Sequence, residues 1–189
     1  MDKGRGTGLC FCAARVALKL PRMEMPPGLS LRAYEERDAD AVRCLHAVAF
    51  RGLAAAHHSP PQIAAHDALI MAPAYAEDLA RSHLLLAVHP ELGLVATAGW
   101  LAMPDRPGTA RIRKVFVHPG MARRGLASAM VSAAEQRARA AGLSKLFVRA
   151  NINAVPLYEK LGYRAIEAGS MPAGGENLPV MFMEKPGGL

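Results

Sequence analysis

Short segments of this chain either alternate between apolar and polar residues or are wholly apolar, as β-strands require. Residues 29–34 alternate, and residues 84–88 form a continuous apolar run that is typical of a buried strand. A turn at Gly93 followed by residues 94–101 predicts the returning strand of a hairpin. Further strands are expected at residues 111–117, 146–150, 163–166 and 178–185. The chain is therefore rich in short strands, and the segments between them decide the fold class.

Those intervening segments show the apolar spacing of helices. Residues 42–53 repeat apolar side chains at helical intervals, and Ser59 followed by two prolines predicts the start of a second helix. A third helix is expected from Leu126 to Gly142, and a short fourth one is expected with Asn153 as its cap. The buried face of the third helix should consist of Leu126, Met130, Ala133, Ala134 and Ala138. Elements in this order predict a single-domain, mixed α/β fold of three layers.

Composition narrows the class of protein. With 189 residues and 51% hydrophobic content, the chain can bury one core, so one domain is the default. No apolar run approaches the ~20 residues that a membrane-spanning helix needs. The three cysteines, Cys10, Cys12 and Cys44, form no even framework, which favours a reducing, cytoplasmic setting. The Cys10–Cys12 spacing is too short for the common zinc pairing, so no metal site is expected there.

The net charge of +7 raises the question of nucleic-acid binding, but its distribution has a simpler explanation. Residues 1–28 carry five basic and two acidic side chains and end in Pro-Pro-Gly. We interpret this segment as a basic, disordered extension, a weak targeting segment or an over-extended translation start, with the first and last favoured. The other basic residues gather around residues 111–124, beside the phosphate loop described next, and nucleic acid is not an expected partner.

The most informative segment runs from Lys114 to Val131. An apolar strand turns at Pro119-Gly120, passes two arginines and Gly125, and becomes an alanine-rich helix. The first N–H groups of such a helix lack intrahelical partners, and the helix dipole adds positive charge behind them. Phosphates could therefore bind on residues 123–128, although many strand–helix junctions carry a glycine and bind nothing.

Two motifs in this half of the chain resemble one known family. Val117-His-Pro-Gly-Met-Ala-Arg-Arg-Gly-Leu-Ala127 is similar to the acyl-coenzyme-A signature of the GCN5-related N-acetyltransferase (GNAT) superfamily. Ala122 departs from it, because the family usually has Arg or Gln there. Asn151-Ile-Asn-Ala-Val-Pro-Leu-Tyr-Glu-Lys-Leu-Gly-Tyr163 is similar to the same family's second signature. The resemblance covers residues 29–185, predicted as the N-acetyltransferase domain, and leaves residues 186–189 as a tail.

The resemblance implies acetyl-CoA as co-substrate and assigns residues to it. In the family the signature strand splays from its neighbour, so that its main chain pairs with the pantetheine arm. Tyr158 matches the tyrosine that protonates the departing thiolate, and a phenol with a pKa of ~10 is a suitable donor at neutral pH. A purely structural tyrosine, with its hydroxyl bonded to backbone, is the alternative. The implied cofactor-binding residues are Val115, Phe116 and Val117 for the pantetheine, Arg123, Arg124, Gly125, Leu126, Ala127 and Ser128 for the pyrophosphate, and Asn151.

The general base is not identified by the sequence. Many relatives carry a glutamate on the signature strand, whereas residues 110–114 contain no acid here, and Phe147 stands where some relatives have a second glutamate. Elsewhere, His118, Asp105 and Glu176 are the candidates. His57, His58 and His66 lie close in sequence, but without cysteine or carboxylate partners they are expected to line a substrate pocket or the surface instead of holding a metal.

These observations predict an acetyl-CoA-dependent N-acetyltransferase that acts directly on a primary amine, expected to be that of a small molecule. Two alternatives stay open. The missing strand glutamate favours a non-catalytic acyl-CoA-binding regulatory module, and a protein N-terminal or lysine acetyltransferase would need an open peptide groove. Homodimer formation also stays open.

Deleting residues 1–24 is expected to change neither the melting temperature nor the affinity for acetyl-CoA, because the segment has no periodic apolar face. Thermal unfolding and calorimetric titration of the truncated and full-length chains check this expectation. A drop of several degrees in the truncated chain would contradict it.

Overall fold

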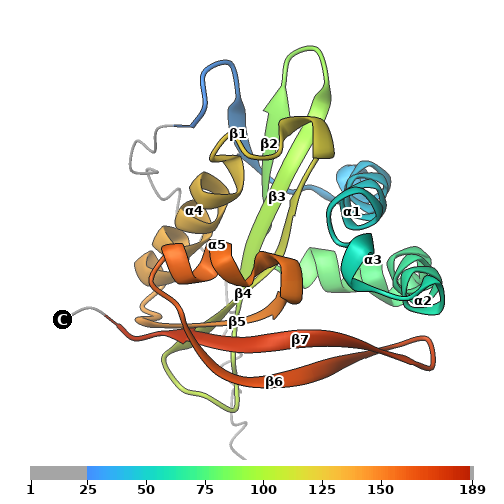
Figure 1. Ribbon diagram of the computed structural model, residues 1–189. Helices are drawn as coiled ribbons and strands as arrows, with labels where there is room; N and C mark the ends of the chain where they lie inside the picture. Colours follow the sequence, from blue (N-terminus) through green and yellow to red (C-terminus); the bar gives the residue numbers. More distant parts are fainter. Residues whose placement is uncertain (1–24, 188–189) are drawn as a thin grey trace, which may run out of the picture.

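The computed structural model describes residues 25–187, in which one seven-stranded sheet is covered by helices on both faces (Figure 1). The strand order is β1-β2-β3-β4-β5-β7-β6, and every neighbouring pair is antiparallel except β4 and β5, which are parallel. The strands are β1 (Ser30–Ala33), β2 (Leu85–His89), β3 (Gly93–Ala102), β4 (Thr109–Val117), β5 (Lys145–Asn151), β6 (Arg164–Ala173) and β7 (Glu176–Lys185). The predicted extension covers residues 1–28, and its residues 1–24 lie outside the described part of the chain.

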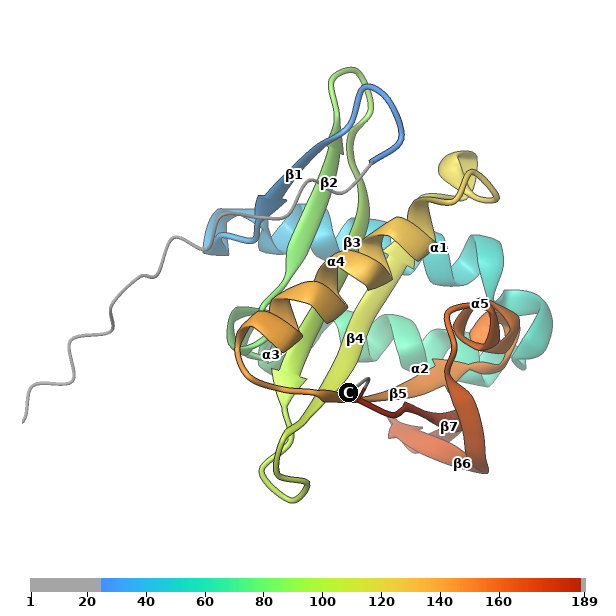
Figure 2. The same ribbon diagram turned by 90° about the vertical axis from the view of Figure 1, so that its left-hand side faces the viewer.

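The helices complete the three predicted layers. Figure 2 shows α4 in front of the sheet and α1, α2 and α3 behind it. The α-helices are α1 (Ala39–Leu53), α2 (Pro60–Met71), α3 (Pro73–Arg81), α4 (Leu126–Ala140) and α5 (Val155–Lys160). Short 3₁₀ turns are η1 (Glu36–Asp38), η2 (Ala55–His57), η3 (Pro119–Met121) and η4 (Ile152–Ala154). The mixed α/β prediction is confirmed.

Local signals explain where the helices begin and end. Ser59 caps α2 as predicted, in a capping box where its Oγ accepts from the Gln62 N–H and the Gln62 side chain accepts from the Ser59 N–H. The sequence analysis did not separate α3 from α2. The chain breaks at Ala72, which is extended because Pro73 disfavours a helical residue before it.

The predicted apolar face of α4 is buried against the sheet. Its five predicted members are at most 3% exposed and pack in one cluster with the inward side chains of β2 to β5. Gly142, with a φ of +85°, follows the end of α4 in the expected left-handed conformation. This packing fixes the start of α4, and with it the loop between β4 and α4, relative to the sheet.

The sheet is split between β4 and β5. Their parallel register runs from the pair Thr109–Lys145 to the pair Ile112–Val148 and then stops. Beyond Ile112 the two strands diverge, so that the second half of β4 has one edge without a strand neighbour. The β3 side of this half stays paired, since Thr97 and Ala96 of β3 oppose Phe116 and Val117.

The hairpin of β6 and β7 reaches across to α2. Ala65 of α2 packs with Ala173 and Leu178 of the hairpin in a small buried cluster. The Gln62 Nε2 atom donates to the Asn177 carbonyl at 2.7 Å. The hairpin tip and the start of α2 therefore close one side of the split. Between residues 25 and 187, no helix is both long and apolar enough to span a membrane.

Candidate active site

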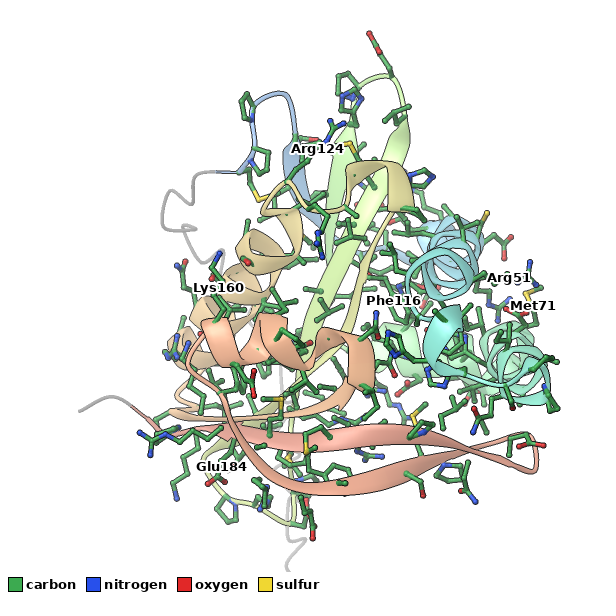
Figure 3. All side chains as sticks on the ribbon, in the orientation of Figure 1. Arg51, Met71, Phe116, Arg124, Lys160 and Glu184 are labelled. Atoms are coloured by element: carbon green, nitrogen blue, oxygen red, sulfur yellow. The ribbon has the colours of Figure 1, made fainter. Side chains whose placement is uncertain are left out.

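A cavity of about 660 Å³ opens where β4 separates from β5. The second half of β4 and the start of α4 form one wall, and the end of α1, the turn η2 and the helix α5 form the others. In Figure 3, Phe116 lies on the side of β4 that faces the helices, and Lys160 lies on α5. The lining includes Phe50, Leu53, His57, Val115, Phe116, Val117, Arg123, Gly125, Leu126, Ala127, Ser128, Asn151, Leu157, Tyr158 and Lys160.

The loop before α4 presents unpaired backbone donors to this cavity. No N–H group of residues 123–128 donates a hydrogen bond to another described residue, whereas the Ala129 N–H begins the helical pattern by donating to the Gly125 carbonyl at 3.0 Å. Arg123 and Gly125 have φ values of +64° and +78°. This run of donors at a helix N-terminus fits an anion such as a pyrophosphate.

The two arginines of the loop, Arg123 and Arg124, line different cavities. Arg123 lines the main cavity with the loop backbone. Arg124 does not line it; its side chain contacts the Met121 sulfur at 4.0 Å and borders a second cavity with His89 and Leu92. Of the residues predicted to bind the cofactor, Arg124 is thus the one whose side chain the structure places away from the main cavity.

A bulge in β4 changes which side chains face the cavity. The β3–β4 register shifts between Thr97 and Gly99, and Lys114 adopts a φ of +55°. Consequently Arg113 and Lys114 lie on the same face, where both form ion pairs with one carboxylate, that of Asp78 in α3. After the bulge, Val115 and Val117 pack toward α4 and Phe116 faces α1. A regular alternation would have put Arg113 and Val115 on one face.

A buried chain of hydrogen bonds holds this bulge. The Thr97 hydroxyl donates to the Lys114 carbonyl at 2.7 Å, so its oxygen must accept from the His46 Nε2–H at 2.8 Å. The other His46 nitrogen, Nδ1, then accepts from the Tyr75 hydroxyl at 2.6 Å. His46 is fully buried, and burial lowers its pKa well below the ordinary value, so it stays neutral. Its ring stacks on Phe116 at 4.0 Å between centroids, which connects the network to the cavity wall.

Tyr158 lies in the opposite wall, on α5. It is 4% exposed and lines the cavity, and its hydroxyl makes no hydrogen bond to another described residue. Burial, together with the charge of Glu135, raises the pKa of Tyr158 above its ordinary value. The phenol is therefore protonated at neutral pH and available as a donor, and no described backbone group satisfies it as the structural alternative would require.

The two asparagines of the second motif have separate positions. Asn151, the last residue of β5 and a predicted cofactor contact, lines the cavity. The predicted cap role of Asn153 is wrong, because α5 begins after Ala154 without a side-chain cap. Instead the Asn153 Nδ2 donates to the Leu53 carbonyl at 2.8 Å and ties α5 to the end of α1.

None of the three candidate bases lines the main cavity. His118 Nδ1 accepts from the Gly120 N–H at 3.2 Å and so stabilises the η3 turn, while Asp105 and Glu176 lie in the β3–β4 loop and at the start of β7. His57, expected above to line a substrate pocket or the surface, does line this cavity. The sequence analysis did not identify Phe50 and Leu53 of α1 as part of the same wall, because α1 reaches the cavity only through tertiary packing.

His58 and His66 belong to the helical layer. Both rings stack on Phe50, with centroid distances of 4.9 Å and 3.5 Å. Burial lowers the pKa of His66 to about 4, so this ring is neutral. Within residues 25–187, no group of three or more His, Cys, Asp or Glu side chains is arranged to hold a metal ion.

Comparison with known proteins agrees with this geometry. The sequence profile of the acetyltransferase (GNAT) family matches residues 44–163. A mycothiol acetyltransferase from Salinispora tropica is 34% identical over 156 residues, which cover 76% of this chain and 47% of that protein. The chain thus spans about half the length of this curated relative.

Solved structures show the same fold. A GCN5-related N-acetyltransferase from Rhodopseudomonas palustris superposes with a TM-score of 0.74 at 27% identity, covering 83% of this chain and 94% of that one. The PaiA N-acetyltransferase from Thermoplasma acidophilum, solved in complex with coenzyme A, has a TM-score of 0.69 at 14% identity, covering 84% and 98%. The chain belongs to the GNAT acetyltransferase family.

Proposed function

We propose that this protein transfers an acetyl group directly from acetyl-CoA to a primary amine of a small molecule. The observation that carries the proposal is one cavity lined by three complementary features. These are the unpaired N–H groups of residues 123–128, the open edge of residues 115–117 and the buried phenol of Tyr158.

In this proposal the chain holds the acyl donor mainly through its main chain. The loop N–H groups and Arg123 bind the pyrophosphate, and Arg124 adds positive charge nearby. The open edge of Val115 to Val117 pairs with the pantetheine amides as an additional strand would. Asn151, at the end of β5, contacts the same arm from the other side of the split.

Tyr158 is proposed as the catalytic acid. Its hydroxyl has no other described partner, and the elevated pKa keeps it protonated and able to donate a hydrogen bond at neutral pH. In the proposed step the amine nitrogen bonds to the acyl carbon while the thioester C–S bond breaks, the sulfur takes the hydroxyl proton as negative charge develops on it, and the phenolate regains a proton from water. His57 also lines this cavity, and we propose its imidazole as the acceptor of the ammonium proton.

A small acceptor is favoured over a protein by the way the split is closed. The start of α2 and the hairpin tip are joined by the Gln62–Asn177 hydrogen bond and the cluster around Ala65, which covers the route that an extended peptide would need. A cytoplasmic location and a homodimer remain proposals from the sequence alone.

Amine-dependent release of free thiol from acetyl-CoA tests the proposal. A panel of small amines should give steady-state thiol release and an acetylated product detectable by mass, while acetyl-CoA alone raises the melting temperature. Acetyl-CoA binding without thiol release on any amine would favour the regulatory-module alternative. Release that requires a peptide amine would favour protein acetylation.

A further inference from the structure

A group of cationic side chains lies on the sheet face opposite α4, where β4 and β5 separate. Arg111 and Arg113 come from β4 and Arg149 from β5, while the residues next to them in each strand pack into the α4 cluster. The bulge adds Lys114 to the same face. Those on β4 precede Phe116 in the strand, so they lie toward the end where β4 and β5 are still paired.

Two of these cations share one carboxylate of α3. The Lys114 Nζ lies 3.0 Å from the Asp78 Oδ2, and Arg113 donates a hydrogen bond to the same oxygen. Burial alone would raise the pKa of Asp78, but the charges of Lys114 and Arg113 outweigh it and hold that pKa below the ordinary value. Asp78 is therefore ionised, and its charge is shared by these two neighbours.

Arg111 has no comparable partner. Its Nε atom is buried without a hydrogen bond, and neither Arg111 nor Arg149 forms an ion pair with any carboxylate in the described part of the chain. Burial, followed by the charge of Arg149, lowers the pKa of Arg111 to about 10, so the guanidinium stays charged at neutral pH. A largely buried charge without a counter-ion is costly, and buried arginines are normally paired.

The positions of Arg111 and Arg149 in the sheet indicate a role in binding the acceptor. Pairing between β4 and β5 ends at Ile112 and Val148. Arg111 and Arg149 are therefore next to the point where the two strands separate, and Val115 lies further along β4, in the separated part. Arg111 is four residues before Val115, at most roughly 13 Å along the bulged strand, and lies on the other face of the sheet. An acceptor whose amine reaches the acyl group near Val115 would place its other end beside the two guanidinium groups.

We propose that Arg111 and Arg149 bind an oxyanion of the acceptor, so that the substrate is an amine that also carries a carboxylate or a phosphate group. The inference rests on the proposed transferase function and names its substrate class. Planar guanidinium groups bind both oxyanions through paired N–H donors. The bound anion would supply the direct ion-pair partner that no described carboxylate gives Arg111.

Matched pairs of amines test the substrate class. The kcat/KM for γ-aminobutyrate and ε-aminocaproate is compared with that for butylamine and hexylamine, and phosphoethanolamine is compared with ethanolamine. The wild-type protein should prefer the anionic member of at least one pair by ~10-fold or more, as expected for hydrogen bonds to a charged group. Preference within the carboxylate or the phosphate pairs identifies which oxyanion is bound.

Two variants connect that preference to the proposed residues. Arg111→Met and Arg149→Met should each reduce the preference for the anionic amine by ~10-fold, mainly through a higher KM for that amine. Arg149 is exposed, so its variant should fold even if Arg111→Met does not. Arg37→Met is the control, because Arg37 is an exposed arginine in η1 that pairs with Glu35, and removing its charge should leave the preference unchanged.

Equal kcat/KM for anionic and neutral amines in the wild-type protein would overturn this inference and leave the transferase proposal standing. A preference that survives in folded Arg111→Met and Arg149→Met proteins would also overturn it. If no amine releases thiol although acetyl-CoA binds, the proposed function fails, and the substrate inference fails with it.

Discussion

Gly125→Val is expected to reduce the affinity for acetyl-CoA by ~100-fold or more while the domain remains folded. A Cβ built at Gly125 meets no protein atom within 4 Å, and Gly125 lines the main cavity. The branched side chain would therefore project into space that the pyrophosphate needs, next to the unpaired N–H groups of residues 123–128. Calorimetric titration with acetyl-CoA measures the loss.

Backbone strain has to be separated from this effect. A non-glycine residue in the left-handed conformation costs roughly 1–2 kcal/mol, which a domain with a stability of about 5–15 kcal/mol tolerates. Gly142→Val is a matched control, because Gly142 follows the other end of α4 with a φ of +85°, has equally open space around its Cβ and does not line the main cavity. Similar melting temperatures with affinity lost only in Gly125→Val would support the loop assignment. Undiminished affinity in folded Gly125→Val would refute it.

Local signals in the sequence predicted much of this site. The strand, turn and helix from residue 111 to 140 follow from apolar periodicity and from Pro119 and Gly125, all of which act over a few residues. The same holds for the N-cap role of Ser59 and for the buried face of α4. The position of Tyr158 in the cavity wall follows from the second motif. These features need little tertiary information.

Other features depend on contacts between distant residues. The bulge at Lys114 is stabilised by the Thr97 hydroxyl from β3 and by His46 from α1, and nothing in the sequence near residue 114 marks it. Asn153 appeared to be a helix cap, but a carbonyl one hundred residues earlier, that of Leu53, takes its side chain. The unpaired state of Arg111 likewise becomes visible only when Asp78 of α3 is seen to pair with its neighbours. The residues proposed to bind the acceptor could therefore be identified only from the structure.

Tyr158→Phe is expected to lower kcat by ~100-fold or more, with the affinity for acetyl-CoA nearly unchanged. The change removes only the hydroxyl, and that hydroxyl has no other described hydrogen-bond partner whose loss could disturb the fold. The loss should shrink with acyl donors whose thiol is more acidic, because a weaker base needs less help to leave. Steady-state kinetics with an active amine and a series of thioesters measure both effects.

The adjacent tyrosine provides the control for Tyr158. The rings of Tyr158 and Tyr163 meet edge to face with centroids 5.3 Å apart, and both are at most 4% exposed. Tyr163 does not line the cavity. Tyr163→Phe therefore removes an equally buried hydroxyl from the same ring pair and should leave kcat within about twofold. If Tyr158→Phe retained wild-type turnover and showed no dependence on the thiol, Tyr158 would be structural and another donor would have to protonate the sulfur.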